Sequence, residues 1–503
     1  MHTFADPIKY ASRMAPTKTA IIDGADSLNF AELHRRCRLL AGALVALGLD
    51  KGDRVAILAN NGQRYIETYM GVPAAGLVVV PLNTRHAVTE LKYALEDSQT
   101  KVLLIDRDPE ELADCVDHVI MIPDAYDTML NESTEVELGV NVEQSDLAGL
   151  FYTGGTTGQS KGVMLSHRNL IANTFHYLAT VPQGKDDLML VMAPLFHAAG
   201  SNSVIANIWT LGTQVTLAAF DPKTALDLIE EHGITESLGV PTMLAAIAEE
   251  QHVRPRKTNT LKMLAHGGSP IATEILRRTH SAFPTAELIE VYGATELSPL
   301  CTILTNEQDL IDSPLARSCG RPAVGNEINI LGPKGERLTP GEIGEVVVRG
   351  PNVMQGYWNK PEQTAAVLVD GAYWTGDLGY MDEQGYVFLV DRSKDMIVSG
   401  GENVYCTEVE EALYQHPTIL EAAVFGVPDD KWGEAVWAVI VPREGSEIEP
   451  SQVIEFCRER IAGYKVPKGI DVQLEPLPKS GPGKVLKREL RAPHWEGQER
   501  SVN

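Results

Sequence analysis

The chain has 503 residues, which is too long for one compact core and predicts two to four domains or subdomains. Its composition is that of an ordinary globular protein, with 44% hydrophobic and 22% charged residues. The formal net charge of −25 argues against nucleic acids and anionic lipid surfaces as partners, because both need a basic protein face.

The N-terminal residues contain no apolar signal core, and no run reaches the apolar length of a membrane span. The six cysteines lie far apart and form no C-x-x-C pair. This pattern favours free thiols in a reducing compartment over a zinc site or a disulfide framework. We therefore expect a cytoplasmic protein without an integral membrane segment.

Apolar periodicity predicts alternating helices and strands through the first half of the chain. The predicted helices are 30–47, 65–75, 90–97, 169–178, 223–231 and 241–250, and the predicted strands are 54–58, 77–81, 101–105, 189–193 and 213–217. Strands that alternate with helices at this spacing indicate parallel sheets with helical crossovers.

The pattern changes near Gly320, where short strands broken by Gly, Pro and Asp predict a β-rich subdomain (328–331, 344–348 and 386–390). After Lys394 a compact α/β stretch follows, with helices at 407–416 and 450–461 and strands at 420–427 and 435–441. The predicted fold class is α/β. It has a large N-terminal domain of mixed sheets with flanking helices and the β-rich subdomain (1–393), then a small C-terminal α/β domain (394–503).

The segment from Tyr152 to Val163 holds four glycines, three threonines and a lysine between two strand-like runs. Glycines let backbone N–H groups converge, and hydroxyls and an ammonium add donors, which suits a polyphosphate. Such loops are also often ordinary turns. A Walker-type loop is excluded because Lys161 is followed by Gly162 and then by a strand-like run, not by Ser or Thr opening a helix.

Two further clusters follow predicted strands. Tyr292 to Glu296 offers an aromatic face for a base, a hydroxyl for phosphate and a carboxylate for Mg²⁺. Tyr373 to Gly379 places the carboxylate of Asp377 between glycines, where it could accept two ribose hydroxyls. Taken separately, the first could be an acidic surface turn and the second a simple Gly-Asp turn.

Two more clusters lie toward the C-terminus. Asp391 to Asp395 carries Arg392, which could reach a ribose or phosphate, just before Gly400 and Gly401. Leu477 to Lys484 presents one lysine on a loop rich in glycine and proline, which could enter a site. The ordinary alternatives are a charged linker and a basic tail.

In this order and at these separations, the five clusters resemble those of the adenylate-forming superfamily, which includes acyl-CoA synthetases, aryl-CoA ligases, peptide-synthetase adenylation domains and firefly luciferase. The resemblance extends from Phe30 to Arg491 and is strongest to the fatty-acyl and 4-coumarate-type CoA ligases. It implies that a carboxylate attacks the α-phosphorus of ATP to give acyl-AMP and pyrophosphate, and that the thiol of coenzyme A then displaces AMP.

The resemblance also implies roles for individual residues. Lys484 would bridge the carboxylate and the α-phosphate, Thr295 would contact the α-phosphate, and Glu296 would bind Mg²⁺. Asp377 and Arg392 would hold the ribose, and Lys394 would be the hinge about which a mobile C-terminal domain turns. The remaining implied residues serve the β- and γ-phosphates (Thr153, Gly154, Gly155, Thr156, Thr157, Lys161), the adenine (Gly267, Gly268, Tyr292, Gly293) and the thiol path (Gly400, Gly401).

The acyl pocket is the least legible part of the sequence. By family position His197 lies where the acyl and nucleotide sites meet, and we expect it to act as a gate or polar lining. The candidate walls are Ser201, Asn202, Gly239, Val240, Pro241, His266 and 297–301. No arginine or lysine follows Glu296 directly, which argues against a second carboxylate on the substrate. A hydrophobic monocarboxylic acid, either fatty or aromatic, fits better.

Between Tyr464 and Arg491 seven basic residues face three acidic ones, an excess that could meet the phosphates of coenzyme A or an acidic neighbouring domain. The expected substrates are therefore the acid, ATP with Mg²⁺, and coenzyme A. Two alternatives stay open: an enzyme that loads a carrier protein, and a non-catalytic nucleotide-binding interaction protein. A homodimer is left open as well.

Overall fold

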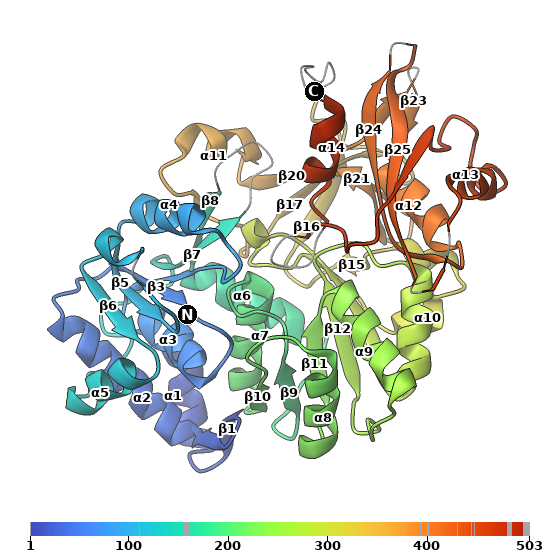
Figure 1. The fold of residues 1–503 in the computed structure, drawn as a ribbon. Helices are drawn as coiled ribbons and strands as arrows, with labels where there is room; N and C mark the ends of the chain where they lie inside the picture. The colour runs from blue at the N-terminus through green and yellow to red at the C-terminus, as the bar shows by residue number, and fades with distance from the viewer. Residues whose placement is uncertain are drawn as a thin grey trace.

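The computed structural model describes residues 2–109, 111–153, 160–392, 395–399, 402–429, 431–443, 445–446, 448–479 and 485–495. Figure 1 shows the elements from α12 onward, in orange and red, beside a larger body formed by the preceding chain. Among the helices that the structure describes, none has the length and apolar character to span a membrane.

The largest sheet has nine strands in the order β15-β14-β13-β12-β11-β9-β10-β1-β2. Its six central strands are parallel, so their carboxyl ends share one edge. The strands are β1 (Thr19–Asp23), β2 (Asp26–Asn29), β9 (Leu188–Val191), β10 (Thr213–Thr216), β11 (Glu236–Gly239), β12 (Met263–Gly267), β13 (Glu287–Tyr292), β14 (Thr302–Leu304) and β15 (Arg321–Pro322).

A second sheet has seven strands in the order β18-β8-β7-β4-β3-β5-β6, parallel from β7 to β6 and antiparallel at β8 and β18. Its central strands are apolar and fully buried, as helices cover both faces. The strands are β3 (Arg54–Leu58), β4 (Val78–Pro81), β5 (Thr100–Ile105), β6 (His118–Met121), β7 (Leu147–Thr153), β8 (Lys161–Ser166) and β18 (Gly356–Tyr357).

Two smaller sheets complete the fold. The first is antiparallel and contains β16 (Glu327–Leu331), β17 (Gly344–Arg349), β19 (Leu368–Val369), β20 (Ala372–Met381) and β21 (Val387–Arg392). The second belongs to the C-terminal part and contains β22 (Ile397–Ser399), β23 (Glu402–Val404), β24 (Ile419–Asp429), β25 (Gly433–Pro442) and β26 (Gly469–Val472).

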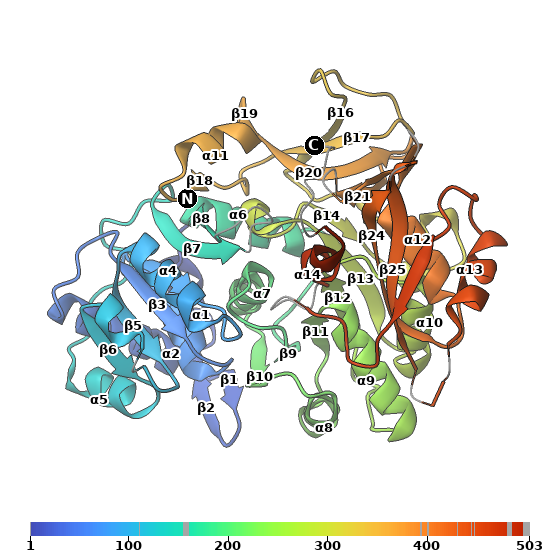
Figure 2. The same ribbon diagram turned by 45° about the horizontal axis from the view of Figure 1, so that its top comes forward.

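Helices α6 (His167–Leu178) and α7 (Ala198–Trp209) lie between the two large sheets in both views (Figures 1 and 2). The other helices cover the outer faces or pack on the C-terminal sheet. They are α1 (Ala5–Met14), α2 (Phe30–Ala46), α3 (Gln63–Ala74), α4 (Val88–Ser98), α5 (Asp124–Glu132), α8 (Pro222–His232), α9 (Pro241–Val253), α10 (Thr273–Ala282), α11 (Pro361–Val367), α12 (Cys406–Tyr414), α13 (Pro450–Arg458) and α14 (Lys487–Arg491).

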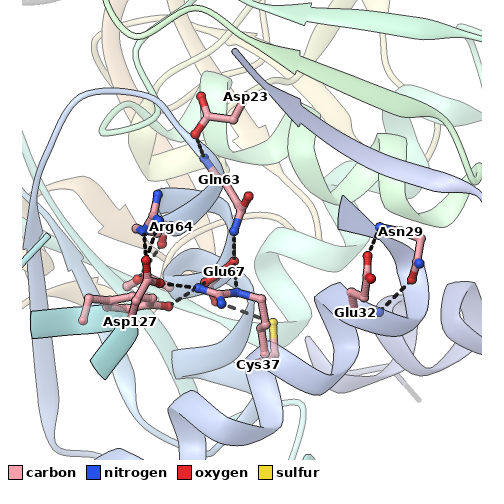
Figure 3. Close-up of polar contacts among 11 residues, drawn as sticks. Asp23, Asn29, Glu32, Cys37, Gln63, Arg64, Glu67 and Asp127 are labelled. Atoms are coloured by element: carbon pink, nitrogen blue, oxygen red, sulfur yellow. Dashed lines mark hydrogen bonds and ion pairs between the residues drawn. The ribbon is translucent and has the colours of Figure 1, made fainter. Parts of the chain in front are cut away.

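The sequence predicts this architecture well. The predicted α/β class is confirmed, and strand 54–58 is found with the predicted bounds as β3. The helix predicted over 30–47 is α2, which begins where the Asn29 side chain caps the backbone N–H of Glu32 and Glu32 returns a bond to Asn29 (Figure 3). Helix α7 has no counterpart among the predicted elements, because its small and polar residues leave a weak apolar stripe.

A buried charge cluster fastens α2, α3 and α5 together (Figure 3). The carboxylate of Glu67, which has no solvent exposure, accepts hydrogen bonds from Arg36 (2.6 Å), Gln63 (2.8 Å) and Tyr126 (3.0 Å). Arg36 also bonds Asp127 at 2.7 Å. Both oxygens of Glu67 are thus hydrogen-bonded, which is the condition for a stable buried charge.

Candidate active site

The first part of the site joins the nine-stranded sheet to the β-rich subdomain. Asp377 on β20 lies opposite Arg392 on β21, and its Oδ1 is 3.2 Å from Arg392 Nε. The hydroxyl of Tyr292, at the end of β13, donates to Asp377 Oδ2 at 2.8 Å. Burial, followed by the charge of Asp377, raises the pKa of Tyr292 well above its usual range. Tyr292 therefore remains a neutral donor.

The second part joins the seven-stranded sheet to the turn that follows β13. Glu296 lies in the short 3-10 turn η2 (Thr295–Leu297), which Thr295 opens. Its Oε1 accepts a hydrogen bond of 2.8 Å from the hydroxyl of Tyr357 on β18. The ammonium of Lys161, on the neighbouring strand β8, lies 4.8 Å from the centre of the Tyr357 ring. A lysine and a carboxylate from two sheets thus meet at one tyrosine.

Tyr373 on β20 links these two parts. Burial raises the pKa of Tyr373 well above its usual range, and the charges of Glu296 and Asp377 raise it further. Tyr373 and Asp377 lie four residues apart on β20, and Glu296 is near enough to affect the same hydroxyl, so the two pairs are neighbours. Strands of two sheets and the turn that follows β13 of a third therefore bring a lysine, an arginine and two carboxylates into one region.

Glycines allow close backbone approach next to this region. A Cβ on Gly267 would lie 2.3 Å from the carbonyl oxygen of Val291, and one on Gly293 would lie 2.1 Å from that of Pro299. Gly268 has a φ of +83°, in the left-handed region that favours glycine. A side chain at Gly267 or Gly293 would clash with neighbouring backbone, so the turns after β12 and β13 require glycine at these positions.

A buried ionic group lies under the same turns. His266 Nε2 is 2.6 Å from Glu307 Oε2, and both side chains are fully buried. Burial lowers the pKa of His266, but the charge of Glu307 outweighs it, so the pKa is raised. Burial and Glu307 together raise the pKa of Glu290 to about 8. His266, a candidate pocket wall, is thus held in the protein interior.

Several predicted site residues lie outside the described part of the chain: Gly154, Gly155, Thr156, Thr157, Lys394, Gly400, Gly401 and Lys484. Their neighbours are described. Thr153, at the end of β7, pairs with Lys161 at the start of β8, so the two strands flank the glycine- and threonine-rich segment as predicted.

The C-terminal part contacts β21 beside the predicted hinge. The carboxylate of Asp391 accepts a 2.6 Å hydrogen bond from the backbone N–H of Cys406, and the hydroxyl of Thr407 donates to the carbonyl of Val390. On the surface of the larger body, Thr273 of α10 donates to Glu411 of α12 at 3.3 Å. The start of α12 is therefore fastened to the end of β21.

The basic residues near the C-terminus are partly neutralised within their own domain. Lys465 pairs with Glu408 at 2.7 Å, Lys487 pairs with Glu410 at 2.7 Å, and Lys479 pairs with Glu421. Three of the seven basic residues thus face acidic groups of their own domain, which is neither of the two roles that the sequence analysis offered for them.

His197 caps the start of α7, and its ring lies 4.4 Å from that of Phe196. Ser201 and Asn202 on α7 are buried, and their side chains bond Leu195 and the α6 residues Asn173 and Thr174. These two predicted wall residues therefore serve helix packing in this structure.

The sequence analysis missed several polar residues that the structure brings to this region. Tyr357, in the two-residue strand β18, has no recognisable motif around it, and Tyr373 opens the predicted Asp377 cluster without having been given a role of its own. Asn207 and Glu236 lie deeper, between α7 and β11. The only signal for Glu236 was an acidic residue at the start of a strand that is otherwise uncharged.

Comparisons with known proteins agree with this geometry. A family model described as AMP-binding enzyme matches residues 8–358, and one described as AMP-binding enzyme C-terminal domain matches 408–484. A feruloyl-CoA synthase from Amycolatopsis sp is 40% identical, with 96% of this chain and 97% of that protein covered. A long-chain-fatty-acid–CoA ligase of Bacillus subtilis (strain 168) is 35% identical over 94% and 91%. The crystal structure of ATP-bound MatB from Rhodopseudomonas palustris superposes with a TM-score of 0.89 at 31% identity, over 97% and 98% of the two chains.

The fold and the site thus define an adenylate-forming enzyme. The chain belongs to the AMP-binding enzyme family, and it is an AMP-forming acyl-CoA synthetase.

Proposed function

We propose that the protein joins a hydrophobic monocarboxylic acid to coenzyme A in two steps. A carboxylate oxygen forms a bond to the α-phosphorus of ATP while the bond to pyrophosphate breaks. The sulfur of coenzyme A then attacks the acyl carbon, AMP leaves, and the thiol proton is lost to solvent. The observation that supports this best is the pair of neighbouring contacts, Asp377 with Arg392 and both Glu296 and Lys161 with Tyr357.

In this proposal the Asp377 pair receives the nucleoside. The Asp377 carboxylate can accept two ribose hydroxyls, since its current donors, Tyr292 and Arg392, can both move aside or share it. The Tyr292 ring and the backbone of Gly267, Gly268 and Gly293 would flank the adenine. Binding of the ribose then exchanges one set of hydrogen bonds at Asp377 for another, and no unpaired charge is buried.

The Glu296 pair would receive the phosphates. Lys161 supplies positive charge, and the segment from Thr153 to Thr157 supplies hydroxyl and backbone donors to the β- and γ-phosphates. Glu296 offers the hard oxygen that Mg²⁺ prefers, already oriented by Tyr357, and Thr295 would contact the α-phosphate. When bound, Mg²⁺ would neutralise charge on the phosphates.

The C-terminal domain, residues 394–503, would act in both steps. Lys484 would stabilise the charge that builds between carboxylate and α-phosphate, and rotation about Lys394 would then replace it by Gly400 and Gly401 on the thiol path. The hydrogen bonds of Asp391 with Cys406 and of Val390 with Thr407 connect the chain on the two sides of the predicted hinge.

The acid is either fatty or aromatic. Relatives of both kinds align along nearly the whole chain, including the feruloyl-CoA synthase at 40% and the long-chain-fatty-acid–CoA ligase at 35% identity. The direct test measures pyrophosphate release and coenzyme A acylation over a panel of both kinds of acid. Pyrophosphate release without any acylated coenzyme A would contradict the proposal and direct attention to a carrier-protein acceptor. Nucleotide binding without pyrophosphate release would indicate a non-catalytic protein.

A variant at Lys484 separates the two steps. We expect Lys484→Ala to lower the rate of adenylation by about 10²–10³-fold, since one charge that stabilises the transition state is lost. Formation of the thioester from supplied acyl-AMP should continue at near the normal rate. Equal loss in both half-reactions would show that Lys484 has no special part in the first. Arg458→Ala, at an exposed arginine on α13 of the same domain, is the control and should leave both rates unchanged.

A further inference from the structure

A row of residues on α7 keeps some solvent exposure inside the N-terminal body. Ala199, Ser203 and Asn207 are spaced by four and therefore lie on one face of the helix. Ala199 and Ser203 are partly exposed although α7 lies between the two large sheets, whereas Asn207, at the far end of the row, is fully buried. Side chains along this face are thus not packed as tightly as in the surrounding core.

A matching row lies on β11 and at its carboxyl end. Val240 and Leu238 are partly exposed, although β11 is an interior strand, and Glu236 lies on the same side of the strand two residues before Leu238. The Glu236 carboxylate raises the pKa of Tyr177 on α6 and is itself affected by Asn207 on α7. This row therefore faces the helices, opposite the row on α7.

Both rows begin beside the region where the acid carboxylate would react. His197 caps the start of α7, and Gly239 and Val240 end β11 at the same edge of the sheet as Tyr292. Each row then runs away from that edge for about 12 Å, from the rise of 1.5 Å per helical residue and about 3.3 Å per strand residue. An acid that entered the domain from the reaction centre would therefore follow a path between the two rows.

The path ends at three buried polar residues, Asn207, Gln214 and Glu236, which we call the Glu236 cluster. Glu236 on β11 and Gln214 on β10 both pair in register with Met189 of the strand between them, so they flank it on one face. Their exposures are 0% for Asn207, 0% for Gln214 and 4% for Glu236. Within the described residues, the side-chain atoms of Gln214 have no hydrogen-bond partner. Asn207 and Glu236 Oε1 form no full hydrogen bond either, although the Asn207 amide lies close enough to Glu236 to lower the pKa of its carboxylate.

Orphaned polar atoms at this depth are costly, about 1–3 kcal/mol for each buried group. One oxygen of Glu236 is satisfied, by Gln183 at 2.8 Å. Burial, with a contribution from Asp187, raises the pKa of Glu236 to about 7, while the amides of Gln183 and Asn207 oppose the rise. An alkyl chain that ended here would leave every orphaned atom without a partner. A hydroxyl could donate to Glu236 and accept from Asn207 at once.

We propose that Glu236 and Asn207 close the acyl pocket and bind a hydroxyl group at the end of the acid farthest from its carboxylate. The proposal rests on the ligase function above. It narrows the substrate to a hydroxylated acid whose ring or alkyl chain lies between the two rows. The hydroxyl is carried either by an aromatic ring or by an alkyl chain. The small side chains of Ala199 and Ser203 leave room for a flat ring beside Leu238.

The test compares pairs of acids that differ by one hydroxyl: 4-hydroxycinnamate with cinnamate, and 10-hydroxydecanoate with decanoate. We expect the wild-type kcat/KM to favour the hydroxylated member of one pair by about 100-fold or more, because the analogue leaves buried polar groups unpaired. The pair with the larger ratio of kcat/KM values shows whether the substrate is an aromatic or an aliphatic acid. Ratios near one for both pairs would overturn the proposal.

Glu236→Leu should reduce that ratio to below about 10-fold, both by weakening activity on the hydroxylated acid and by improving activity on its partner. Glu236→Gln should keep most of the preference, because an amide still bonds a hydroxyl. The ratio does not depend on how much of a preparation is folded, so a merely structural role of Glu236 would leave it unchanged and would refute the proposal. Glu231→Gln, at an exposed acid on α8, is the control. If no acid on the panel is activated at all, the ligase function itself fails instead.

Discussion

The Glu67 cluster (Arg36, Glu67, Tyr126 and Asp127) and the Glu236 cluster each contain a buried carboxylate, but the two carboxylates differ in their hydrogen-bond partners. In the first, both oxygens of the central carboxylate are hydrogen-bonded to side chains of α2, α3 and α5 (Figure 3). In the second, one carboxylate oxygen and two amides form no full hydrogen bond with any residue that the structure describes. A buried polar group whose hydrogen-bond partners are all side chains of the protein stabilises the fold. A buried group left unpaired is better explained by a ligand that supplies the partner.

The largest test of this contrast is Glu67→Ala. Removal of the carboxylate leaves Arg36 buried with a weaker set of partners, so we expect a loss of about 3–5 kcal/mol in the stability of the N-terminal part. Urea unfolding followed by circular dichroism measures it, as a shift in the first transition. Arg35→Ala, at an exposed arginine on the same helix paired with Glu135, is the matched control and should cost less than about 1 kcal/mol. Similar losses in the two variants would show that the Glu67 cluster is not structurally important.

The second test uses pH and Glu236→Gln. The folded-state pKa of Glu236 is about 7, above the ordinary value of 4.5, so the folded protein keeps a proton that the unfolded chain has lost. Stability from this group is fully present below pH 4.5 and is lost as the pH rises through 7. The slope is at most about 1.4 kcal/mol per pH unit.

The Glu236→Gln variant has no ionisable group at this position, so its stability should lack this pH-dependent contribution. Thermal midpoints of both proteins between pH 4.5 and 8 should therefore diverge, with the wild type falling relative to the variant as the pH rises. Parallel curves of thermal midpoint against pH would mean that Glu236 is ionised over the whole range. Its carboxylate would then have hydrogen-bond partners or bound water in the free protein.

The two clusters also differ in how far the sequence reveals them. Strands such as β3 and helices such as α2 follow from apolar periodicity and capping residues that are local in sequence. The adenylate-forming motifs around Tyr292, Glu296 and Asp377 are also local, since each lies within a few residues of a strand end. Which of them touch could not be predicted. The meeting of Glu296 with Tyr357, 61 residues later, depends on the pairing of β18 with β8.

The Glu236 cluster could not be predicted either, because it too depends on contacts between segments that are distant in sequence. Asn207, Gln214 and Glu236 come from a helix and two strands, and their convergence depends on the order β11-β9-β10, in which β9 precedes both neighbours in sequence. Short-range patterns carry no information about that order. The motifs that predict nucleotide recognition are therefore local in the sequence, whereas the proposed recognition of the acid depends on tertiary structure.

The smallest test deletes one polar function from each cluster without a large change in shape. Tyr126→Phe removes the donor to Glu67, and we expect a loss of about 1–2 kcal/mol, because the bond was buried and its acceptor is charged. Gln214→Met removes an amide that has no partner among the described residues, at almost constant volume, so stability should stay within about 0.5 kcal/mol or increase. Both are measured by urea unfolding in the absence of acid. A loss above about 1 kcal/mol for Gln214→Met would mean that the amide is already satisfied in the free enzyme, by ordered water or by a neighbour. The Glu236 cluster would then be a structural network like the one around Glu67, and the contrast on which the acid assignment depends would disappear.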